Sequence, residues 1–213
     1  MADHHVRRLS RLQMITARNM HQAQQETAHA TLHTQCDVTA LVARAGGSVS
    51  APVVYALTQA LGEHPHFNAH LTTDELCLYE RIKLGMMLHT GQGVMLACIQ
   101  DAQSMSLPAL EAALKSLHER AQTGRFDLSE TRGATFMVAD LSAYPVDAFT
   151  PILLPSAIGV LGIGRVRPAC RPTEAGCRAV HLLSLSLTFD HRGADGIDAA
   201  RLLAAIVRRL EEG

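Results

Sequence analysis

The sequence lacks the charge imbalance and the long apolar segments that would point to a polyanion or a lipid bilayer as a partner. Its 19 lysine and arginine residues nearly cancel its 20 aspartate and glutamate residues, and like charges do not cluster in runs. Binding to nucleic acid or to a membrane is therefore not expected. No stretch reaches the roughly 18 apolar residues of a membrane helix, and histidines and arginines interrupt the apolar positions near the start, where a signal peptide would need a continuous apolar core. We expect a soluble, cytoplasmic protein.

Cysteine pairs at metal-binding spacings are also missing. The cysteines are odd in number, scattered and mostly in apolar surroundings, as reduced core cysteines usually are: Cys36, Cys77, Cys98, Cys170 and Cys177. The spacing of the last two matches no common zinc knuckle. We therefore expect reduced thiols and no metal site.

Linkers rich in proline or serine, low-complexity tracts and internal repeats are absent as well. A chain of 213 residues with 47% hydrophobic residues can bury one substantial core. We therefore expect a single domain over residues 1–213, without additional modules.

Apolar spacing along the chain predicts both helices and strands. Helices are expected at residues 11–24, 39–41, 50–61, 106–121 and 197–210. Strands are expected at residues 29–38, 67–71, 76–79, 82–89, 94–99, 135–138, 158–163 and 180–189. Because the two kinds of element interleave without regular βαβ spacing, the expected fold class is an α/β sandwich with a mixed sheet.

His191 is the clearest candidate for chemistry, because it stands where a long apolar strand ends and the last helix begins. Side chains at such junctions can project from rigid elements into a cleft. Asp190, Arg192, Asp195 and Gly196 surround it and supply an orienting or ion-pairing carboxylate, a turn glycine and a helix cap. A histidine that only ends the strand with local hydrogen bonds is the alternative. Its neighbours favour a general base.

The segment 190–196, DHRGADG, resembles the D-H-R-x-x-D-G hallmark of the catalytic domains of dihydrolipoamide acyltransferases in 2-oxo acid dehydrogenase complexes. A related H-x-x-x-D-G core occurs in chloramphenicol acetyltransferases and in nonribosomal peptide condensation domains. Further segments resemble this family in its own order: LSRLQMITARNM its opening helix, CDVTAL its first strand exit, HFNAHL its F-N-A-S segment, ATFMVADL its T-F-T-I-S-N-L strand and FTPILLPSAIGVLGIGRV its F-T-P-I-x-N-P-P segment. The resemblance covers nearly residues 8 to 213.

The resemblance implies a chloramphenicol-acetyltransferase-like two-layer sandwich that assembles as a homotrimer, with active sites in channels between subunits. His191 would take the proton of a thiol that attacks a thioester, with coenzyme A or acyl-CoA as a substrate. An imidazole suits this proton transfer near neutral pH. Asp195 would orient and brace the site, with an arginine as a conceivable partner, although an ordinary helix cap explains it equally well. Whether trimers associate into a larger assembly stays open.

Two further positions match the family. Asn68 would fix the backbone around the channel, although a simple turn residue is at least as good an explanation. Arg18 matches an arginine of the opening helix, although a solvated helix face accounts for it as well.

The acyl side of the implied site departs from the family. There, a serine of the T-F-T-I-S-N-L strand, commonly from the adjacent subunit, donates a hydrogen bond to the oxyanion, and the aligned position here is Ala139. Losing one such donor typically costs on the order of 2.7 to 4 kcal/mol, a rate factor of about 100 to 1000. Neither Ser142, in the following loop, nor Thr135, further back along the strand, is a convincing replacement. Ala97, His70 and Leu154 also replace residues that the family usually has.

A lipoyl domain, a subunit-binding domain and Ala/Pro-rich linkers do not precede the core in this sequence. A lipoyl group would therefore arrive in trans, on a separate lipoyl or acyl-carrier protein, or free acyl-CoA would serve instead. The intact motif around His191 favours a stand-alone acyltransferase, in which His191 deprotonates an acceptor thiol or another nucleophile, a hydroxyl or an amine. Ala139 and the altered channel positions favour the second hypothesis, a catalytically weakened core or scaffold subunit of a multienzyme complex.

Overall fold

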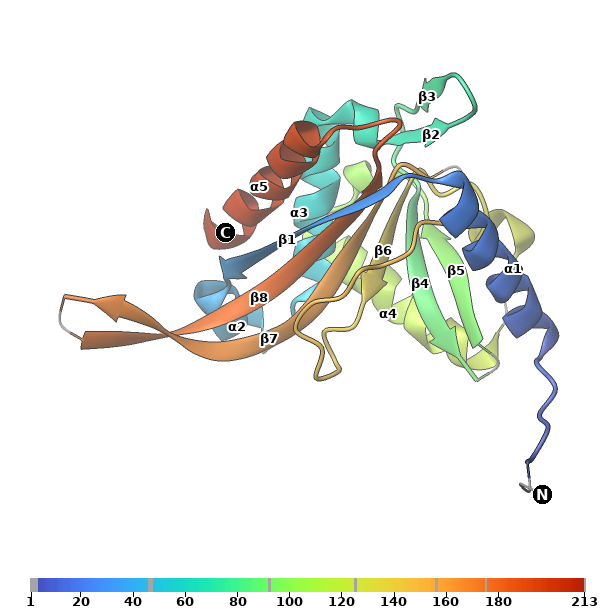
Figure 1. Ribbon diagram of the computed structural model, residues 1–213. Coiled ribbons are helices and arrows are strands. Elements are labelled where there is room, and N and C mark those ends of the chain that lie inside the picture. Colours follow the sequence, from blue (N-terminus) through green and yellow to red (C-terminus); the bar gives the residue numbers. More distant parts are fainter. Residues whose placement is uncertain are drawn as a thin grey trace.

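The main feature of the fold is one mixed sheet. The computed structural model describes residues 4–45, 48–91, 93–124, 126–155, 157–174 and 176–212. Six of its strands form the sheet in the order β1-β8-β7-β6-β4-β5 (Figure 1). Their bounds are His29–Asp37 (β1), Leu84–Thr90 (β4), Gly93–Ile99 (β5), Phe136–Asp140 (β6), Gly159–Thr173 (β7) and Gly176–Asp190 (β8). Strand β6 runs parallel to both its neighbours, β4 and β7, and the other pairs are antiparallel.

A small hairpin and the helices complete the architecture. The hairpin pairs β2 (Ala69–Leu71) with β3 (Leu76–Leu78) and stands beyond one end of the sheet (Figure 1). The α-helices are Arg11–Glu26 (α1), Thr39–Ala45 (α2), Ser50–Glu63 (α3), Leu107–Thr123 (α4) and Gly196–Glu212 (α5). Short 3-10 turns occur at Pro65–Phe67, Ala102–Ser104 and Leu128–Thr131. Helices α3, α4 and α5 pack together over one face of the sheet, whereas α1 lies along the edge strand β5.

Local sequence explains where two of these helices start. Ser10 accepts a hydrogen bond from the Gln13 N–H while the Gln13 side chain accepts one from the Ser10 N–H, which is a capping box at the start of α1. The Ser106 hydroxyl accepts a hydrogen bond from the Ala109 N–H at the start of α4. The predicted helix at 106–121 is thus confirmed, and Ser106 is its N-cap.

The sheet separates two apolar clusters. Successive side chains of a strand point to opposite faces, so Phe136 and Val138 of β6 join the large core beneath the helices. Met137 and Ala139 join a much smaller cluster on the other face. The segment between β6 and β7 crosses this second face (Figure 1), and Leu153 of that segment is fully buried in the small cluster. One face of the sheet is therefore covered by helices and the other by a single loop.

Strands β7 and β8 are much longer than predicted. The sequence indicated strands at 158–163 and 180–189, but each strand has 15 residues, and together they form a ribbon that projects beyond the sheet (Figure 1). The outer half of the ribbon is exposed on both faces and carries Pro168 and Pro172. An exposed segment has no alternation of apolar and polar residues, and prolines argue against a strand. The outer part of the ribbon therefore lacks the alternating pattern from which half-buried strands are predicted, and the sequence did not indicate it as strand.

The expectation of reduced thiols at Cys170 and Cys177 was wrong. The two residues form a disulfide across the ribbon, with their Cα atoms 5.8 Å apart. The register pairs Cys170 with Ala179 and Cys177 with Pro172, which makes the cysteines diagonal neighbours. Only the length of the ribbon, which the sequence did not indicate, brings them together. Among the described residues Cys36, Cys77 and Cys98 are free thiols.

The predicted α/β sandwich with a mixed sheet is confirmed, and every predicted helix and strand is present within a few residues of its expected bounds, apart from the ribbon. No helix of the described ranges is long and apolar enough to cross a membrane.

Candidate active site

His191 lies at the end of β8, on a turn that leads into α5. Its N–H donates a hydrogen bond to the carbonyl of Ala28, 2.9 Å away, and its ring lies 5.6 Å from the ring of Phe189. The side chain is exposed, and no residue of the described ranges hydrogen-bonds to the imidazole. The backbone of His191 is therefore fixed while its ring nitrogens stay available.

The carboxylate of Asp190 stabilises this turn. Asp190 is 1% exposed, and hydrogen-bond donors surround its carboxylate. Arg192 donates to both carboxylate oxygens, from Nε at 3.0 and 3.1 Å and from Nη2 at 2.6 Å. The N–H groups of Arg192 and Ala28 donate to Oδ1 at 3.1 and 3.3 Å. Burial by itself raises the pKa of the Asp190 carboxyl, but these hydrogen bonds outweigh burial and hold the pKa below its ordinary value. The carboxylate is therefore ionised and braces the turn.

Asp195 caps helix α5. Its Oδ1 accepts hydrogen bonds from the N–H groups of Asp198 and Ile197, both at 2.8 Å. The bond from Asp198 is the largest cause of the lowered pKa of Asp195, and the nearby His191 ring adds to it. The capping role is thus present in the structure. Arg192, the arginine of the motif, pairs with Asp190.

Asn68 directly follows the 3-10 turn Pro65–Phe67. His66 of that turn has its Nε2 3.9 Å from an oxygen of Asp198, in the first turn of α5. Asn68 is 3% exposed and donates from Nδ2 to the carbonyls of Tyr79 and Arg81, at 2.6 and 3.3 Å. These bonds fix the start and the end of the β2–β3 hairpin. Its Oδ1 is buried and has no hydrogen-bond partner in the described part of the chain.

His70, which the sequence indicated only as a departure from the family, is held from both sides. Its Nε2 lies 2.7 Å from the carbonyl of Ala134 and its Nδ1 lies 3.1 Å from the hydroxyl of Tyr79. Since a carbonyl can only accept, Nε2 carries a proton and Nδ1 can accept from the tyrosine. His70 therefore ties the hairpin to the sheet, a role for which the sequence contains no local signal.

The other candidates lie away from His191 within one subunit. Ala139 pairs with Gly162 of β7, and Gly162 pairs with Ser186, five residues before His191 on β8. At about 3.3 Å per residue and about 4.8 Å between strands, the backbones of Ala139 and His191 are on the order of 19 Å apart. Ser142 turns away after β6, where its N–H donates to Asp140 at 2.8 Å. Arg18 lies on the exposed face of α1.

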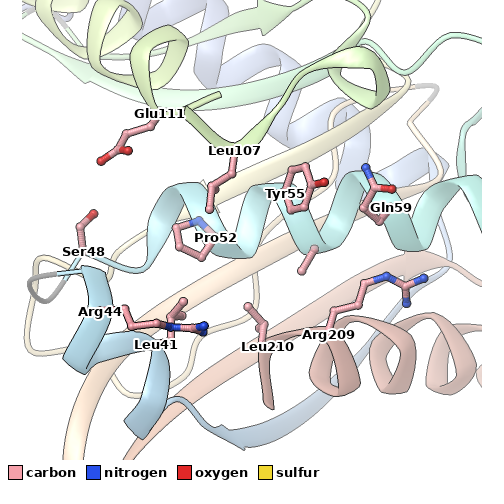
Figure 2. Close-up of a pocket in the computed structure, with 11 residues that line it drawn as sticks. Leu41, Arg44, Ser48, Pro52, Tyr55, Gln59, Leu107, Glu111, Arg209 and Leu210 are labelled. Carbon is pink, nitrogen blue, oxygen red and sulfur yellow. The ribbon is translucent and has the colours of Figure 1, made fainter. Parts of the chain in front are cut away.

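Two adjoining cavities, of about 430 and 360 Å³, open on the face of the sheet that carries Ala139. Asn19, Leu96, Arg132 and Leu154 line both of them. A larger cavity of about 750 Å³ lies on the helical layer, between α2, α3, α4 and the last turns of α5 (Figure 2). His191 precedes the first turn of α5, a helix that is about 25 Å long, so this larger cavity is remote from it.

Comparison with known proteins agrees with this architecture. The family model for the catalytic domain of 2-oxoacid dehydrogenases acyltransferase matches residues 1–213. The chain is 34% identical, over 96% of its length, to the dihydrolipoyllysine-residue acetyltransferase component of a pyruvate dehydrogenase complex from Mycobacterium bovis. It is 36% identical, over 74% of its length, to the corresponding component of an acetoin cleaving system from Bacillus subtilis. The chain spans about two fifths of each relative, 40% and 39%.

Solved structures give the same picture. A dihydrolipoamide acetyltransferase from Azotobacter vinelandii, studied for the role of a serine, a histidine and an asparagine in its catalytic mechanism, matches with a TM-score of 0.91 and 25% identity over 99% of this chain and 92% of its own. Chloramphenicol acetyltransferase matches with a TM-score of 0.58 and 13% identity over 92% of each chain, which shows the shared fold. With its fold, its motif around His191 and a family match along its whole length, this chain belongs to the family of 2-oxoacid dehydrogenase acyltransferase catalytic domains.

Proposed function

We propose that this domain is an acyltransferase that moves an acyl group between a thioester and a thiol, with His191 as the general base. The observation that carries the proposal is the turn at 190–196, which fixes the backbone of His191 and leaves its ring free. The serine, histidine and asparagine studied in the Azotobacter enzyme are spaced as Ala139, His191 and Asp195 are here. That correspondence supports His191 as the base.

The reaction follows from this arrangement. The imidazole takes the proton of the acceptor thiol, and the sulfur attacks the thioester carbonyl to form a tetrahedral oxyanion. Collapse of the oxyanion re-forms the carbonyl and expels the donor thiolate, which recovers the proton from the imidazolium. We propose coenzyme A or an acyl-CoA as one partner and a lipoyl group, carried in trans on a separate lipoyl or acyl-carrier protein, as the other.

We further propose that the site is completed between subunits of a homotrimer. Within one subunit the backbones of Ala139 and His191 are on the order of 19 Å apart, which is too far for one thioester carbonyl to contact both residues. In a trimer, β6 of one subunit can face His191 of the next. A related pyruvate dehydrogenase core of known structure is cubic, and we propose that trimers of this chain can likewise associate further.

The opposing possibility is a weakened core subunit, since Ala139 offers no hydroxyl to the oxyanion. One experiment separates the two. The purified protein is mixed with acetyl-CoA and longer acyl-CoAs and with free dihydrolipoamide or carrier proteins, and transfer is measured for wild type and for His191→Ala. His89→Ala is the matched control, because His89 is an exposed histidine on β4.

A general base contributes about 100- to 10,000-fold, so His191→Ala should lose that factor while His89→Ala keeps the wild-type rate. Equal rates for wild type and His191→Ala would remove the histidine from the mechanism. No acylation of any acceptor by the wild type would favour the scaffold.

A further inference from the structure

The cavity of about 430 Å³ on the loop-covered face lies beside the expected position of the thioester carbonyl. Met137 lines this cavity, and Ala139 follows it on the same face of β6, about 7 Å away. Leu96 and Leu154 also line the cavity and pack against the same small cluster as Ala139. An acyl group whose carbonyl carbon lies at Ala139 therefore has this cavity next to it.

The lining of the cavity combines apolar side chains, which are buried or half-buried, with the exposed Arg132. Leu96, Met137, Leu154 and Ala157 supply apolar surface, and the described lining residues include no aspartate or glutamate. Arg132 is the one cation among the lining residues that the structure describes, and it lines the adjoining cavity of about 360 Å³ too, which again has no acidic lining residue in the described ranges. The space therefore suits a chain that is apolar near the carbonyl and anionic at its far end.

The backbone around Arg132 is held in place. Its carbonyl accepts a hydrogen bond from the Cys98 thiol at 3.7 Å, and the next residue, Gly133, has a φ of 71°, which favours glycine. In the described residues no carboxylate lies within ion-pair distance of the Arg132 guanidinium, whereas Arg120, near by in the sequence, pairs with Glu130 at 2.6 Å. Two side-chain amides, Asn19 and Gln22 of α1, line the same cavity.

His70 also lines the cavity, but both its ring nitrogens already bond to Ala134 and Tyr79. His70 therefore lines the cavity but has no free ring nitrogen with which to bind a ligand. This leaves Arg132 as the group that can recognise an anion, since a guanidinium binds a carboxylate through two parallel hydrogen bonds.

We propose that this cavity takes the acyl chain of a thioester whose far end is a carboxylate, and that Arg132 determines this specificity. The proposal deepens the proposed acyl transfer and rests on it. A short neutral acyl group would leave the cavity largely empty and the guanidinium without a partner. A four- or five-carbon dicarboxylic acyl chain places its carboxylate at Arg132 while its methylenes contact Leu96, Met137 and Leu154.

The test compares glutaryl-CoA with valeryl-CoA, which differ in the terminal carboxylate. The ratio of their kcat/KM values is measured for the full chain and for Arg132→Gln, which removes the positive charge and keeps a polar side chain that can donate hydrogen bonds. Arg44→Gln is the control, because Arg44 lines the cavity on the opposite, helical layer (Figure 2).

Hydrogen bonds to charged groups are worth about 1.5 to 3 kcal/mol, a factor on the order of 10 to 150. We expect the wild type to prefer glutaryl-CoA, and Arg132→Gln to lower kcat/KM for glutaryl-CoA by about tenfold to 150-fold while valeryl-CoA is unaffected. A wild-type ratio near one, or an equal loss for both substrates in the variant, overturns the assignment.

The proposed acyl transfer can fail separately. If no acyl-CoA reacts at all, dissociation constants are measured for non-hydrolysable thioether analogues of both compounds. A preference for the carboxylated analogue that Arg132→Gln abolishes supports the binding assignment even without turnover. Equal binding of the two analogues refutes it.

Discussion

The proposed site has a base side, the turn around His191, and an acyl side, the face of β6 with Ala139. The base side resembles the family closely, whereas the acyl side departs from it. On the base side, the turn at 190–196 keeps the whole motif, and both oxygens of the buried Asp190 carboxylate accept hydrogen bonds. On the acyl side, β6 presents Met137 and Ala139, and the cation of the adjoining cavity is Arg132. Under the proposed function, this difference predicts that proton transfer is kept while oxyanion stabilisation and acyl recognition differ from those of the family.

Restoring the missing hydroxyl should have the largest effect on this contrast. Ala139 is only partly buried, on the side of β6 that faces the small cluster, so Ala139→Ser adds one donor with little steric demand. An oxyanion donor is worth about 100- to 1000-fold, and we expect dihydrolipoamide acylation to rise toward that factor. Ala143→Ser, at an exposed position in the next turn, is the control. An unchanged rate in Ala139→Ser would show that another group already serves the oxyanion.

Removing the charge of Asp190 should lower the free energy of unfolding of the protein, because this carboxylate stabilises the turn that carries His191. Asp190→Asn removes the ionic partner of Arg192 and replaces one of the two buried carboxylate oxygens that accept hydrogen bonds. We therefore expect the free energy of unfolding, measured in urea, to fall by about 3 kcal/mol. Asp147→Asn is the control, because Asp147 forms an exposed pair with Arg165 and such pairs contribute little. A variant as stable as the wild type would mean that the turn is held by its backbone bonds alone.

The pH dependence of that loss is a separate prediction. The pKa of Asp190 is lowered in the folded protein from its ordinary value of 3.8. Its contribution to stability is therefore complete above that value and is lost as the pH falls through 3.8 and on through the folded pKa. The difference in unfolding free energy between wild type and Asp190→Asn should be constant from neutral pH to about pH 5 and shrink below it. A difference that grows on acidification would contradict the assignment.

Substitutions of Asp195 should give the smallest effect on stability. They separate its role as the cap of α5 from a role in orienting His191. Asparagine caps helices about as well as aspartate, so Asp195→Asn should leave the thermal midpoint unchanged, whereas Asp195→Ala should lower it by a few degrees. Acyl transfer measured in the same two variants then reports the orientation of His191. If Asp195→Asn lowers the rate without a change in the midpoint, Asp195 acts on the imidazole as well as on the helix. If both variants keep the rate, it is a cap only.

Local sequence predicted what depends on neighbouring residues. The helices at 11–24 and 106–121, the strand before His191 and the helix after it are all determined by patterns within a few positions. Features that depend on distant segments were not predictable. The Cys170–Cys177 disulfide needs the register of an exposed ribbon, and His70 reaches Ala134 across 64 positions. Arg132 stands out only when α1, β5 and the loop before β7 are seen to enclose one space.

The pairing of the first strand of the sheet with the last one has a consequence for how this protein is made. The Ala28 N–H that donates to Asp190 and the Ala28 carbonyl that accepts from His191 lie more than 160 positions from their partners. Contacts this distant in sequence form slowly, because the entropy of closing so large a loop must be overcome first. During synthesis, β1 therefore leaves the ribosome long before β8 exists, and its edge is unpaired throughout that time. The turn that holds His191 is among the last parts of the domain to take shape.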